Sequence, residues 1–497
     1  MVSSAAPAPI PDAAEILAAA PPVRREPGAR EKIRTTNVAA GRRIAVLDDD
    51  PTGSQTVHDV SVVTVFDDAE YAAALSEPGS ACFVLTNTRS LPENAAVELN
   101  TRVAASLYSL GRTLNAPVEV VSRGDSTLRG HVVGEIRAID AARRRVTGAG
   151  FDGVLLVPAY FEAGRFTAGD VHWAVVGGEA IPVGASEFAK DATFGYTTSN
   201  LRDFVAEKSR GAIKAADVRS VTLEDIRAGG PDRVAEILGE VTGGTFVVVN
   251  ATDYADLDVV VLGLLDAQAW GKSFGYRCGP SFPQVLAGLD PQAPLTAQQV
   301  WPDGHPGGHG LVVVGSHVGL TNRQVTRAQE RSLPVTIEVD VATLVDAELR
   351  DSHVAAISAQ VSDALKSSDV LLFTSRTLLR GCDADDSLAI ARTVSTAVIE
   401  VVRAALAAGP SWVIAKGGIT SHDVAVRGLG IRRALVLGQL LPGMVSVFRP
   451  IDASPTAVGI PYVVFAGNVG NDETLADVID LLTVSARQPD PEQRGDQ

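Results

Sequence analysis

The sequence predicts an α/β protein with two domains, each built on a mainly parallel sheet, and an active-site cleft between them. Its 497 residues are enough for two or three domains of about 150 residues. From about residue 42, short aliphatic runs alternate with helical stretches, which is the pattern of βαβ units. A Pro- and Gly-rich segment at residues 289–310 divides these units into two sets and predicts a linker. The hydrophobic fraction of 46% excludes a disordered chain.

Residues 41–288 are predicted to form the first domain. Continuous apolar runs such as residues 153–157 suit strands that are buried on both faces of a parallel sheet. The expected strands of this domain are 43–47, 61–65, 82–86, 118–122, 153–157 and 245–249. Helical periodicity over residues 93–110 and 132–144 predicts the connecting helices.

Residues 311–486 are predicted to form the second domain on the same plan. Its expected strands are 311–314, 335–339, 370–373, 412–415 and 462–466, and its expected helices include 321–331, 387–408 and 472–485. Residues 1–40 are rich in Ala and Pro and are expected to be a disordered extension. Residues 487–497 are polar and are expected to be a frayed tail.

Charge and cysteine content limit the classes of partner. The net charge of −16 disfavours a nucleic-acid binder, which needs a clustered positive face, but it allows an anionic substrate in a local basic pocket. The three cysteines are far apart, so neither a zinc site nor a disulfide framework is predicted. No apolar run reaches about 18 residues, so no membrane span is expected. We therefore expect a cytoplasmic protein; a homodimer is left open.

Three glycine-containing turns follow expected strands of the second domain. They lie at residues 315–319, 416–421 and 467–471, and an expected helix follows each turn. Glycine lets the backbone approach a ligand, and a helix start presents free N–H groups. Because the carboxyl ends of parallel strands share one edge, the three turns together predict a phosphate cradle. Neither a P-loop nor a full GxGxxG turn after a strand is present.

Polar clusters follow three expected strands of the first domain. Three aspartates occupy residues 48–50, where like charges are costly to pack unless a proton, a metal or a substrate hydroxyl is near. Residues 86–90 and 122–131 mix Arg with Ser, Thr, Asp and Asn. Arginine binds carboxylates by two-point contacts, while Asp and Asn bind hydroxyls, so these clusters predict a site for a small hydroxylated acid.

The motifs resemble those of the four-carbon acid sugar kinase family. The similar segments, in order, are DDDPTG at 48–53, GDSTLRG at 124–130, PAYFEAGR at 158–165, VGS at 314–316, GGIT at 417–420 and GNVG at 467–470. The resemblance spans about residues 43–485, and GDSTLRG is its most specific element. The opening turn departs from the family pattern at Asp48 and at residues 51–55, and the last motif has Val469 where Phe is common.

The resemblance implies an enzyme that uses ATP and Mg²⁺ to phosphorylate the terminal hydroxyl of threonate, erythronate or a 3-oxo-tetronate. It implies that the first domain takes the sugar acid and the second takes the nucleotide. The implied catalytic residues are Asp49, Asp50 and Asp125, with the choice among them left open, and the implied substrate-binding residues are Arg89, Ser126, Arg129 and Arg165. The implied nucleotide-binding residues are Ser316, Gly417, Gly418, Thr420, Gly467 and Asn468, while metal ligands stay unassigned.

Two other functions compete with this interpretation. The first is an NAD(P)-dependent oxidoreductase of a small hydroxy acid, for which the missing GxGxxG turn is unfavourable. The second is a non-catalytic sugar-acid sensor, which the intact glycine turns disfavour.

Overall fold

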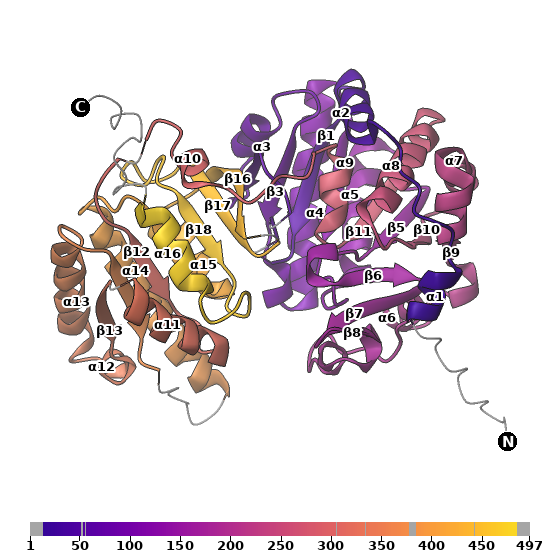
Figure 1. Ribbon diagram of the computed structural model, residues 1–497. Coiled ribbons are helices and arrows are strands. Elements are labelled where there is room, and N and C mark those ends of the chain that lie inside the picture. Colours follow the sequence, from indigo (N-terminus) through magenta and orange to yellow (C-terminus); the bar gives the residue numbers. More distant parts are fainter. Residues whose placement is uncertain are drawn as a thin grey trace, which may run out of the picture. The chain divides into compact units, whose positions relative to one another are not determined.

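The computed structural model describes residues 13–50, 53–54, 56–304, 306–332, 334–376, 384–441 and 443–484 (Figure 1). The chain divides into two compact units. Unit 1 comprises residues 1–53 and 66–291, and unit 2 comprises residues 54–65 and 292–497. In each unit, helices alternate along the chain with mainly parallel strands, which confirms the predicted α/β class.

Unit 1 contains a parallel sheet whose central strands are buried on both faces. Its strand order is β3 (Ala81–Leu85), β1 (Arg43–Asp48), β4 (Val118–Arg123), β11 (Phe274–Cys278), β5 (Gly153–Val157), β10 (Thr245–Val249) and β9 (Arg219–Val221). Every neighbouring pair in this series is parallel. All residues of β1 and β5 are buried, as their apolar runs predicted. All residues of β11, a strand that was not predicted, are buried too.

The helices of unit 1 pack in pairs. Helix α4 (Glu93–Leu114) packs against α5 (Val132–Thr147), and α7 (Gly230–Gly239) packs against α8 (Tyr254–Ala269). A capping box from Asp253 and Asp256 begins α8, which is almost entirely buried. The shorter helices of this unit are α3 (Asp68–Ala74), α6 (Leu201–Lys208) and α9 (Ser281–Leu286).

The prediction of a disordered extension is wrong for residues 13–39. Helices α1 (Ala13–Ala19) and α2 (Ala29–Ala39) lie in this segment, and α2 packs against α8. Ile33 is fully buried, and the Asn37 side chain donates to the carbonyl of Leu286 over 2.9 Å. The local Ala- and Pro-rich composition concealed these tertiary contacts; residues 1–12 lie outside the described part of the chain.

A small antiparallel sheet in unit 1 was not predicted. It is formed by β6 (Arg165–Ala168), β7 (Val171–Val176) and β8 (Glu179–Pro182). Trp173 of β7 lies in a small core with Ala13 of α1. The sheet places Arg165, a predicted substrate-binding residue, at the start of β6.

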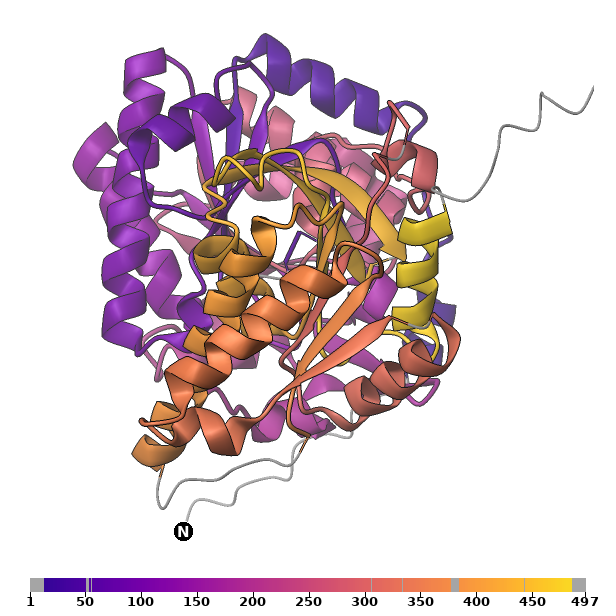
Figure 2. The same ribbon diagram turned by 90° about the vertical axis from the view of Figure 1, so that its left-hand side faces the viewer.

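Unit 2 contains a mixed sheet. The parallel part has the order β13 (Val335–Val339), β14 (Val370–Thr374), β12 (Leu311–Val314), β15 (Val413–Lys416) and β18 (Tyr462–Phe465). It continues with the antiparallel strands β17 (Val445–Asp452), β16 (Arg433–Leu441) and β2 (Val60–Val63). The long helices are α11 (Gly319–Arg331), α13 (Arg350–Ala364), α14 (Ala384–Leu406) and α16 (Thr474–Val484). Figure 2 shows orange helices of this unit lying across its strands.

Two boundaries differ from the predicted domains. The strand expected at residues 61–65 of the first domain is β2, which pairs with β16 in unit 2. Residues 292–304 of the expected linker also belong to unit 2, where Val300 is fully buried and the Leu295 N–H donates to Gln439. An apolar run shows that a strand exists but not which sheet it joins, so sequence patterning could not assign either segment.

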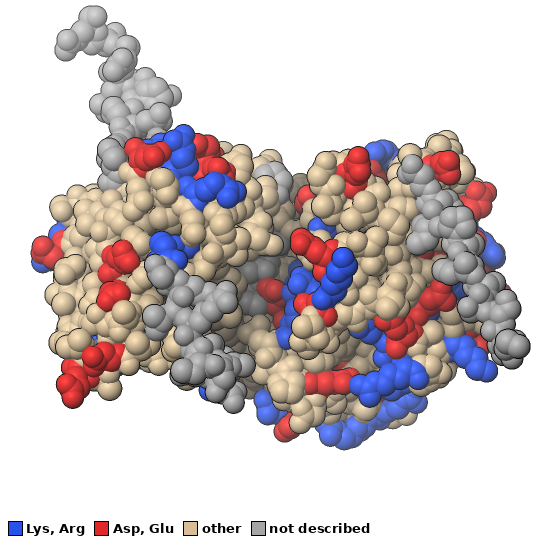
Figure 3. Space-filling view, turned by 90° about the horizontal axis from the view of Figure 1, so that it is seen from below, with Lys and Arg blue, Asp and Glu red and all other residues tan. Residues whose placement is uncertain are grey.

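The described residues contain no helix that is both long enough and apolar enough to cross a membrane. Figure 3 shows acidic and basic side chains interspersed on the face that it presents, rather than a field of one sign.

Candidate active site

Unit 1 places its polar clusters where its strand order reverses. Strand β3 pairs with one side of β1 and β4 with the other, so the crossover connections diverge between β1 and β4. Ligands of open α/β sheets bind at such a switch point, beyond the carboxyl ends of the strands. Asp48 and Arg123 end these two strands in register, and the Arg123 Nη1 donates to Asp48 Oδ1 over 2.8 Å.

Asp48 is a buried structural carboxylate. Burial raises its pKa to about 7, and Asp49 and Asp50 add to this shift, while Arg123 opposes it. Its main-chain carbonyl accepts from the Thr86 hydroxyl over 2.8 Å and so fixes the start of the next polar cluster. A Cβ at Gly53 would lie 1.9 Å from Asp48 Oδ2, so residue 53 must be glycine for the turn to close here.

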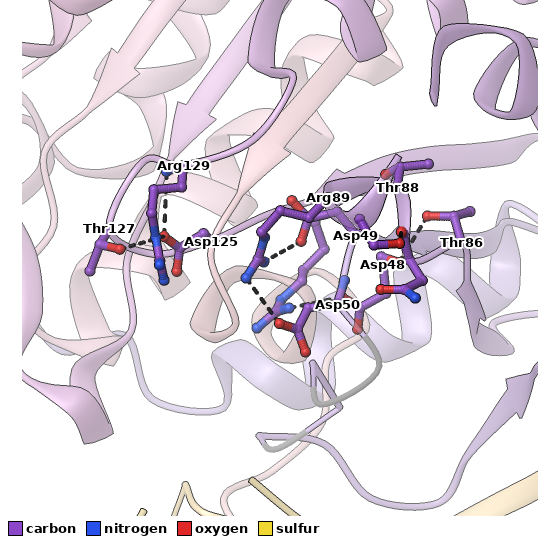
Figure 4. Close-up of polar contacts among 12 residues, drawn as sticks. Asp48, Asp49, Asp50, Thr86, Thr88, Arg89, Asp125, Thr127 and Arg129 are labelled. Carbon is purple, nitrogen blue, oxygen red and sulfur yellow. Dashed lines mark hydrogen bonds and ion pairs between the residues drawn. The ribbon is translucent and has the colours of Figure 1, made fainter. Parts of the chain in front are cut away.

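Arg89 joins the other two aspartates of this segment (Figure 4). Its Nη2 pairs with Asp49 Oδ1, and its Nη1 donates to Asp50 Oδ2 over 2.9 Å. Asp49 is only 1% exposed, and its second oxygen lies 3.3 Å from Arg277 Nη2. The structure therefore brings three predicted site residues together, but both terminal nitrogens of Arg89 are engaged by aspartates.

Arg277 is a site residue that sequence analysis missed. It lies in β11, is 4% exposed, and binds Asp49, the buried Glu135 and the Ser122 hydroxyl. A Cβ at Gly124 would lie 2.1 Å from its guanidinium, which explains the glycine there. An arginine inside an otherwise apolar strand was the available signal, since a buried charge needs partners.

The loop after β4 presents Asp125 with one oxygen engaged and the other open. Asp125 Oδ2 accepts from the Thr127 hydroxyl and from Arg129 Nε, the latter over 2.7 Å (Figure 4). Burial alone would raise the pKa of Asp125, but Arg89, Arg129 and Thr127 outweigh burial and lower it. Among the described residues, Oδ1 takes part in no hydrogen bond, so this carboxylate is ionised and has an acceptor to offer.

Buried polar contacts hold the Asp125 loop in shape. His172 Nε2 donates to the main-chain carbonyl of the buried Ser126 over 2.7 Å, and the Tyr196 hydroxyl donates to that of Thr127 over 2.7 Å. Burial lowers the pKa of His172 to about 4, so the ring is neutral near pH 7. Leu128 has φ 70°, a left-handed conformation that bulky side chains rarely adopt. Such a residue persists only where its surroundings enforce it, as in a preorganised ligand loop.

Two arginines of the predicted acid pocket flank one aromatic ring. The guanidinium carbons of Arg129 and Arg165 each lie 5.5 Å from the centroid of Phe188. Burial lowers the pKa of Arg165, while Asp125 opposes that shift. Within the described ranges, no carboxylate forms an ion pair with Arg165, whose Nη1 bonds only to main-chain carbonyls. Arg165 thus combines partial burial with an unneutralised charge.

The three glycine turns of unit 2 meet at its own switch point, between β12 and β15. A Cβ at Gly467 would lie 2.6 Å from Ser316 Oγ, and one at Gly315 would lie 2.2 Å from Thr420 Oγ1. Gly417 has φ 120° and also lies against Ser316 and Thr420. These approaches confirm that the three turns lie together.

The remaining predicted nucleotide residues lie at the open side of this cradle. A Cβ at Gly418 would meet no atom within 4 Å, and Asn468 is exposed. The Thr321 hydroxyl donates to the Gly467 carbonyl over 2.8 Å and so joins the first turn of α11 to the last glycine turn. Backbone N–H groups beside unfilled space are the features that bind phosphate.

Lys416 and Arg376 add positive charge to the cradle, and sequence analysis missed both. Lys416 ends β15 and is fully buried; its Nζ donates to the Ala466 carbonyl over 3.1 Å and lies 3.7 Å from the Phe465 ring centroid. Burial lowers the pKa of Lys416 to about 7. Arg376 follows β14 and donates to the Ser316 carbonyl. A lysine directly before Gly417 was the signal for the first.

The described residues offer little to bind a metal by themselves. No group of three or more His, Cys, Asp or Glu side chains in the described part of the chain is arranged to hold an ion. The aspartates after β1 pair with arginines instead. Mg²⁺ is commonly held chiefly by substrate phosphates with few protein carboxylates, so a nucleotide could bring the ion with it.

Comparisons with known proteins match both units. A family model described as a sugar-binding N-terminal domain matches residues 44–286, and one described as a nucleotide-binding C-terminal domain matches residues 311–475. The chain belongs to the four-carbon acid sugar kinase family.

One relative and two solved structures are similar to most of the chain. A D-erythronate kinase of Heliobacterium modesticaldum is 26% identical over 338 residues, which is 66% of this chain and 70% of the relative. A crystal structure of a Salmonella typhimurium LT2 protein has TM-score 0.64 at 18% identity, covering 88% of this chain and 98% of that one. A Haemophilus influenzae structure has TM-score 0.60 at 19% identity, covering 88% and 99%. At these identities the two structures show the shared fold.

Proposed function

We propose that this protein is an ATP-dependent kinase that phosphorylates the terminal hydroxyl of a four-carbon sugar acid: threonate, erythronate or a 3-oxo-tetronate. The observation that carries the proposal is the grouping of Asp125, which has an open oxygen, with Arg129 and Arg165 in a family with sugar- and nucleotide-binding domains. The D-erythronate kinase among its relatives supports the same substrate class.

Arg165 is the best anchor for the carboxylate of the acid. Arg89 is less suitable, because both of its terminal nitrogens already bind Asp49 and Asp50. Arg129 lies on the same ring as Arg165 and has one nitrogen bound to Asp125. A substrate carboxylate between Arg129 and Arg165 would satisfy the unneutralised charge of Arg165 by charge-assisted hydrogen bonds.

Asp125 is the best candidate to receive the hydroxyl proton. Asp49 uses both oxygens for arginines and is almost inaccessible, so it supports the site from within. Asp50 is more exposed and is tied to Arg89. Asp125 Oδ1 can accept a hydrogen bond from a substrate hydroxyl while Thr127 and Arg129 hold Oδ2. Its lowered pKa keeps the carboxylate ionised but makes it a weak base, so it orients the nucleophile by a hydrogen bond and takes the proton only as the oxygen–phosphorus bond forms.

The glycine turns of unit 2 would hold ATP by its phosphates. Main-chain N–H groups near Ser316, Gly417 and Gly467 would donate to phosphate oxygens, with Lys416 adding charge below them. Mg²⁺, when bound to the nucleotide, would neutralise part of the triphosphate charge. The placement of both ligands in one cleft between the domains stays a prediction.

The reaction then requires positioning more than covalent chemistry. The hydroxyl oxygen bonds to the γ-phosphorus as the bond from that phosphorus to the β–γ bridging oxygen breaks. ADP leaves, and the hydroxyl proton passes to Asp125 and then to solvent. Because the transition state is loose, most of the rate gain comes from orientation and charge neutralisation.

The test is ADP release from ATP and Mg²⁺ with D- and L-threonate, D- and L-erythronate and their 3-oxo analogues. We expect release that depends on one acid, with a phosphate ester as the second product. ATP alone and the Asp125→Asn variant are the controls. Reduction of NAD(P)⁺ by a hydroxy acid without ADP release would support the oxidoreductase. Binding of an acid with no turnover of any nucleotide would support the non-catalytic sensor. Either of these two results would overturn the proposal.

A further inference from the structure

A second polar cavity lies at the opposite edge of the unit 1 sheet. It has a volume of about 520 Å³ and is bordered by the first residues of β4 and β11, including Glu119 and Phe274. The candidate acid site lies at the carboxyl ends of the same strands, at Arg123 and Cys278. A strand of six residues spans about 20 Å, so the two are separate sites.

Positive side chains surround this cavity. Arg42, Arg112, Arg143 and Lys272 line it, against one lining carboxylate, Glu119. Arg42 pairs with Glu119 over 3.6 Å. Lys272 lies 3.9 Å from Asp152 at the margin. Neither Arg112 nor Arg143 forms an ion pair with a carboxylate in the described part of the chain; both donate to main-chain carbonyls.

The cavity also contains a buried donor without a partner. Tyr108 is only 6% exposed, and its hydroxyl forms no hydrogen bond with any described residue. Burial, with Glu119 adding to it, raises the pKa of Tyr108, so the hydroxyl keeps its proton. A buried hydroxyl without a partner costs free energy, and a ligand acceptor would remove that cost. Tyr108 belongs to α4 and Arg143 to α5, and these helices pack against each other, so the two groups are held in place.

We propose that this cavity is a second ligand site that binds a small anion with two negative charges, using Arg112 and Arg143 for charge and the Tyr108 hydroxyl as a donor, with Lys272 at its margin. A phosphate group and a short dicarboxylate share this chemistry. The Arg143 guanidinium lies 5.6 Å from the centroid of the Phe151 ring, a cation–π contact that restrains its position beside the cavity. The proposal is independent of the kinase activity.

The experiment is calorimetric titration of the full chain with inorganic phosphate and, separately, with succinate. We expect one of the two to bind; which one binds distinguishes a phosphate ligand from a dicarboxylate ligand. Arg143→Ala should weaken binding by roughly tenfold or more, and Tyr108→Phe by roughly tenfold, because each removes a hydrogen bond to a charged group. Arg137→Ala is the matched control, since Arg137 is exposed on the same helix and does not line the cavity.

Tyr108→Phe also separates a ligand site from a structural role. The hydroxyl has no partner to lose, so the thermal unfolding midpoint should stay unchanged while anion affinity falls. Arg129→Ala tests whether the ion enters the acid site instead. Loss of binding in Arg129→Ala with retention in Arg143→Ala would overturn the proposal. So would the absence of binding by either ion at millimolar concentration, or equal affinity in wild type and Tyr108→Phe.

Discussion

The candidate sites of the two units lie at the same topological position, but one consists of side chains and the other of backbone turns. In unit 1 the site consists of side chains, and Asp48, Asp49 and Asp50 are each paired with an arginine. In unit 2 it consists of three backbone turns, with the buried Lys416 bonded to a main-chain carbonyl. The difference follows the ligands we propose. A small hydroxylated acid is recognised by directed side-chain groups, whereas a phosphate chain is held by N–H groups and open space.

The largest expected effect is on turnover through the open carboxylate of unit 1. Asp125→Asn should lower kcat by about 10²–10⁴-fold, because an amide cannot take the hydroxyl proton. ADP release with the cognate acid measures the change, and nucleotide affinity in unit 2 should stay constant. Asp203→Asn, at an exposed residue of α6, is the matched control. Wild-type kcat in Asp125→Asn would remove this residue from the mechanism.

The next largest expected effect is a loss of stability when a buried ion-pair partner is removed from unit 1. Arg277→Ala leaves the buried Asp49 and Glu135 without this partner and should cost about 3–5 kcal/mol in free energy of unfolding. Urea unfolding followed by circular dichroism measures it. Arg165→Ala is the comparison variant, because Arg165 pairs with no carboxylate in the described ranges. This variant should raise KM for the acid, while the free energy of unfolding should change little. Equal destabilisation by both variants would contradict the division between supporting and ligand-binding arginines.

A smaller effect is expected when a glycine of either candidate site is replaced by alanine, and the quantity that changes should differ between the two sites. Gly130 has φ 120°, and a Cβ there would lie 2.7 Å from Arg277 and 3.0 Å from Asp49, so Gly130→Ala should destabilise by about 1–3 kcal/mol. Gly148→Ala is the control, since Gly148 has φ 86° but open space around it. In Gly467→Ala the added methyl meets the Ser316 hydroxyl at 2.6 Å, so nucleotide affinity should fall more than stability. Unfolding midpoints and nucleotide titrations of the three variants provide the measurement.

The last expected effect is a pH dependence that comes from Lys416. Its folded pKa of about 7 is below the ordinary value of 10.5, so the unfolded chain binds more protons between these values. Lys416 should therefore make unfolding free energy rise with pH from about 7 to about 10. The difference between the urea unfolding midpoints measured at the two ends of this range should be smaller in Lys416→Met than in wild type.

Lys416→Met should also lower nucleotide affinity by about tenfold if the charge reaches the phosphates. Proton uptake on nucleotide binding near pH 8, seen by calorimetry in buffers of different ionisation enthalpy, should disappear in the variant. Lys366→Met, at an exposed lysine of unit 2, is the control. Unchanged affinity and proton uptake would make Lys416 a structural residue only.

The sequence indicated which turns form the two candidate sites. Glycines at 315, 417 and 467 and the segment 124–130 could be recognised because backbone freedom and turn chemistry are local properties. The sequence could not show that both terminal nitrogens of Arg89 are engaged, or that Arg277 lies under Asp49, because these contacts join residues 39 to 228 positions apart. For the same reason β2 was assigned to the first domain rather than to unit 2, and α1 and α2 were taken for disorder.

The sequence by itself determined the α/β class, the two sets of strands and the positions of the polar and glycine turns, because hydrophobic periodicity and glycine content act over a few residues. Only the tertiary structure decided which charges neutralise one another and which stay available to a ligand. Asp49 and Asp125 have the same side chain, yet one is enclosed by two arginines and the other keeps an open oxygen. Burial and pairing depend on the whole fold, and they set the chemistry of a carboxylate.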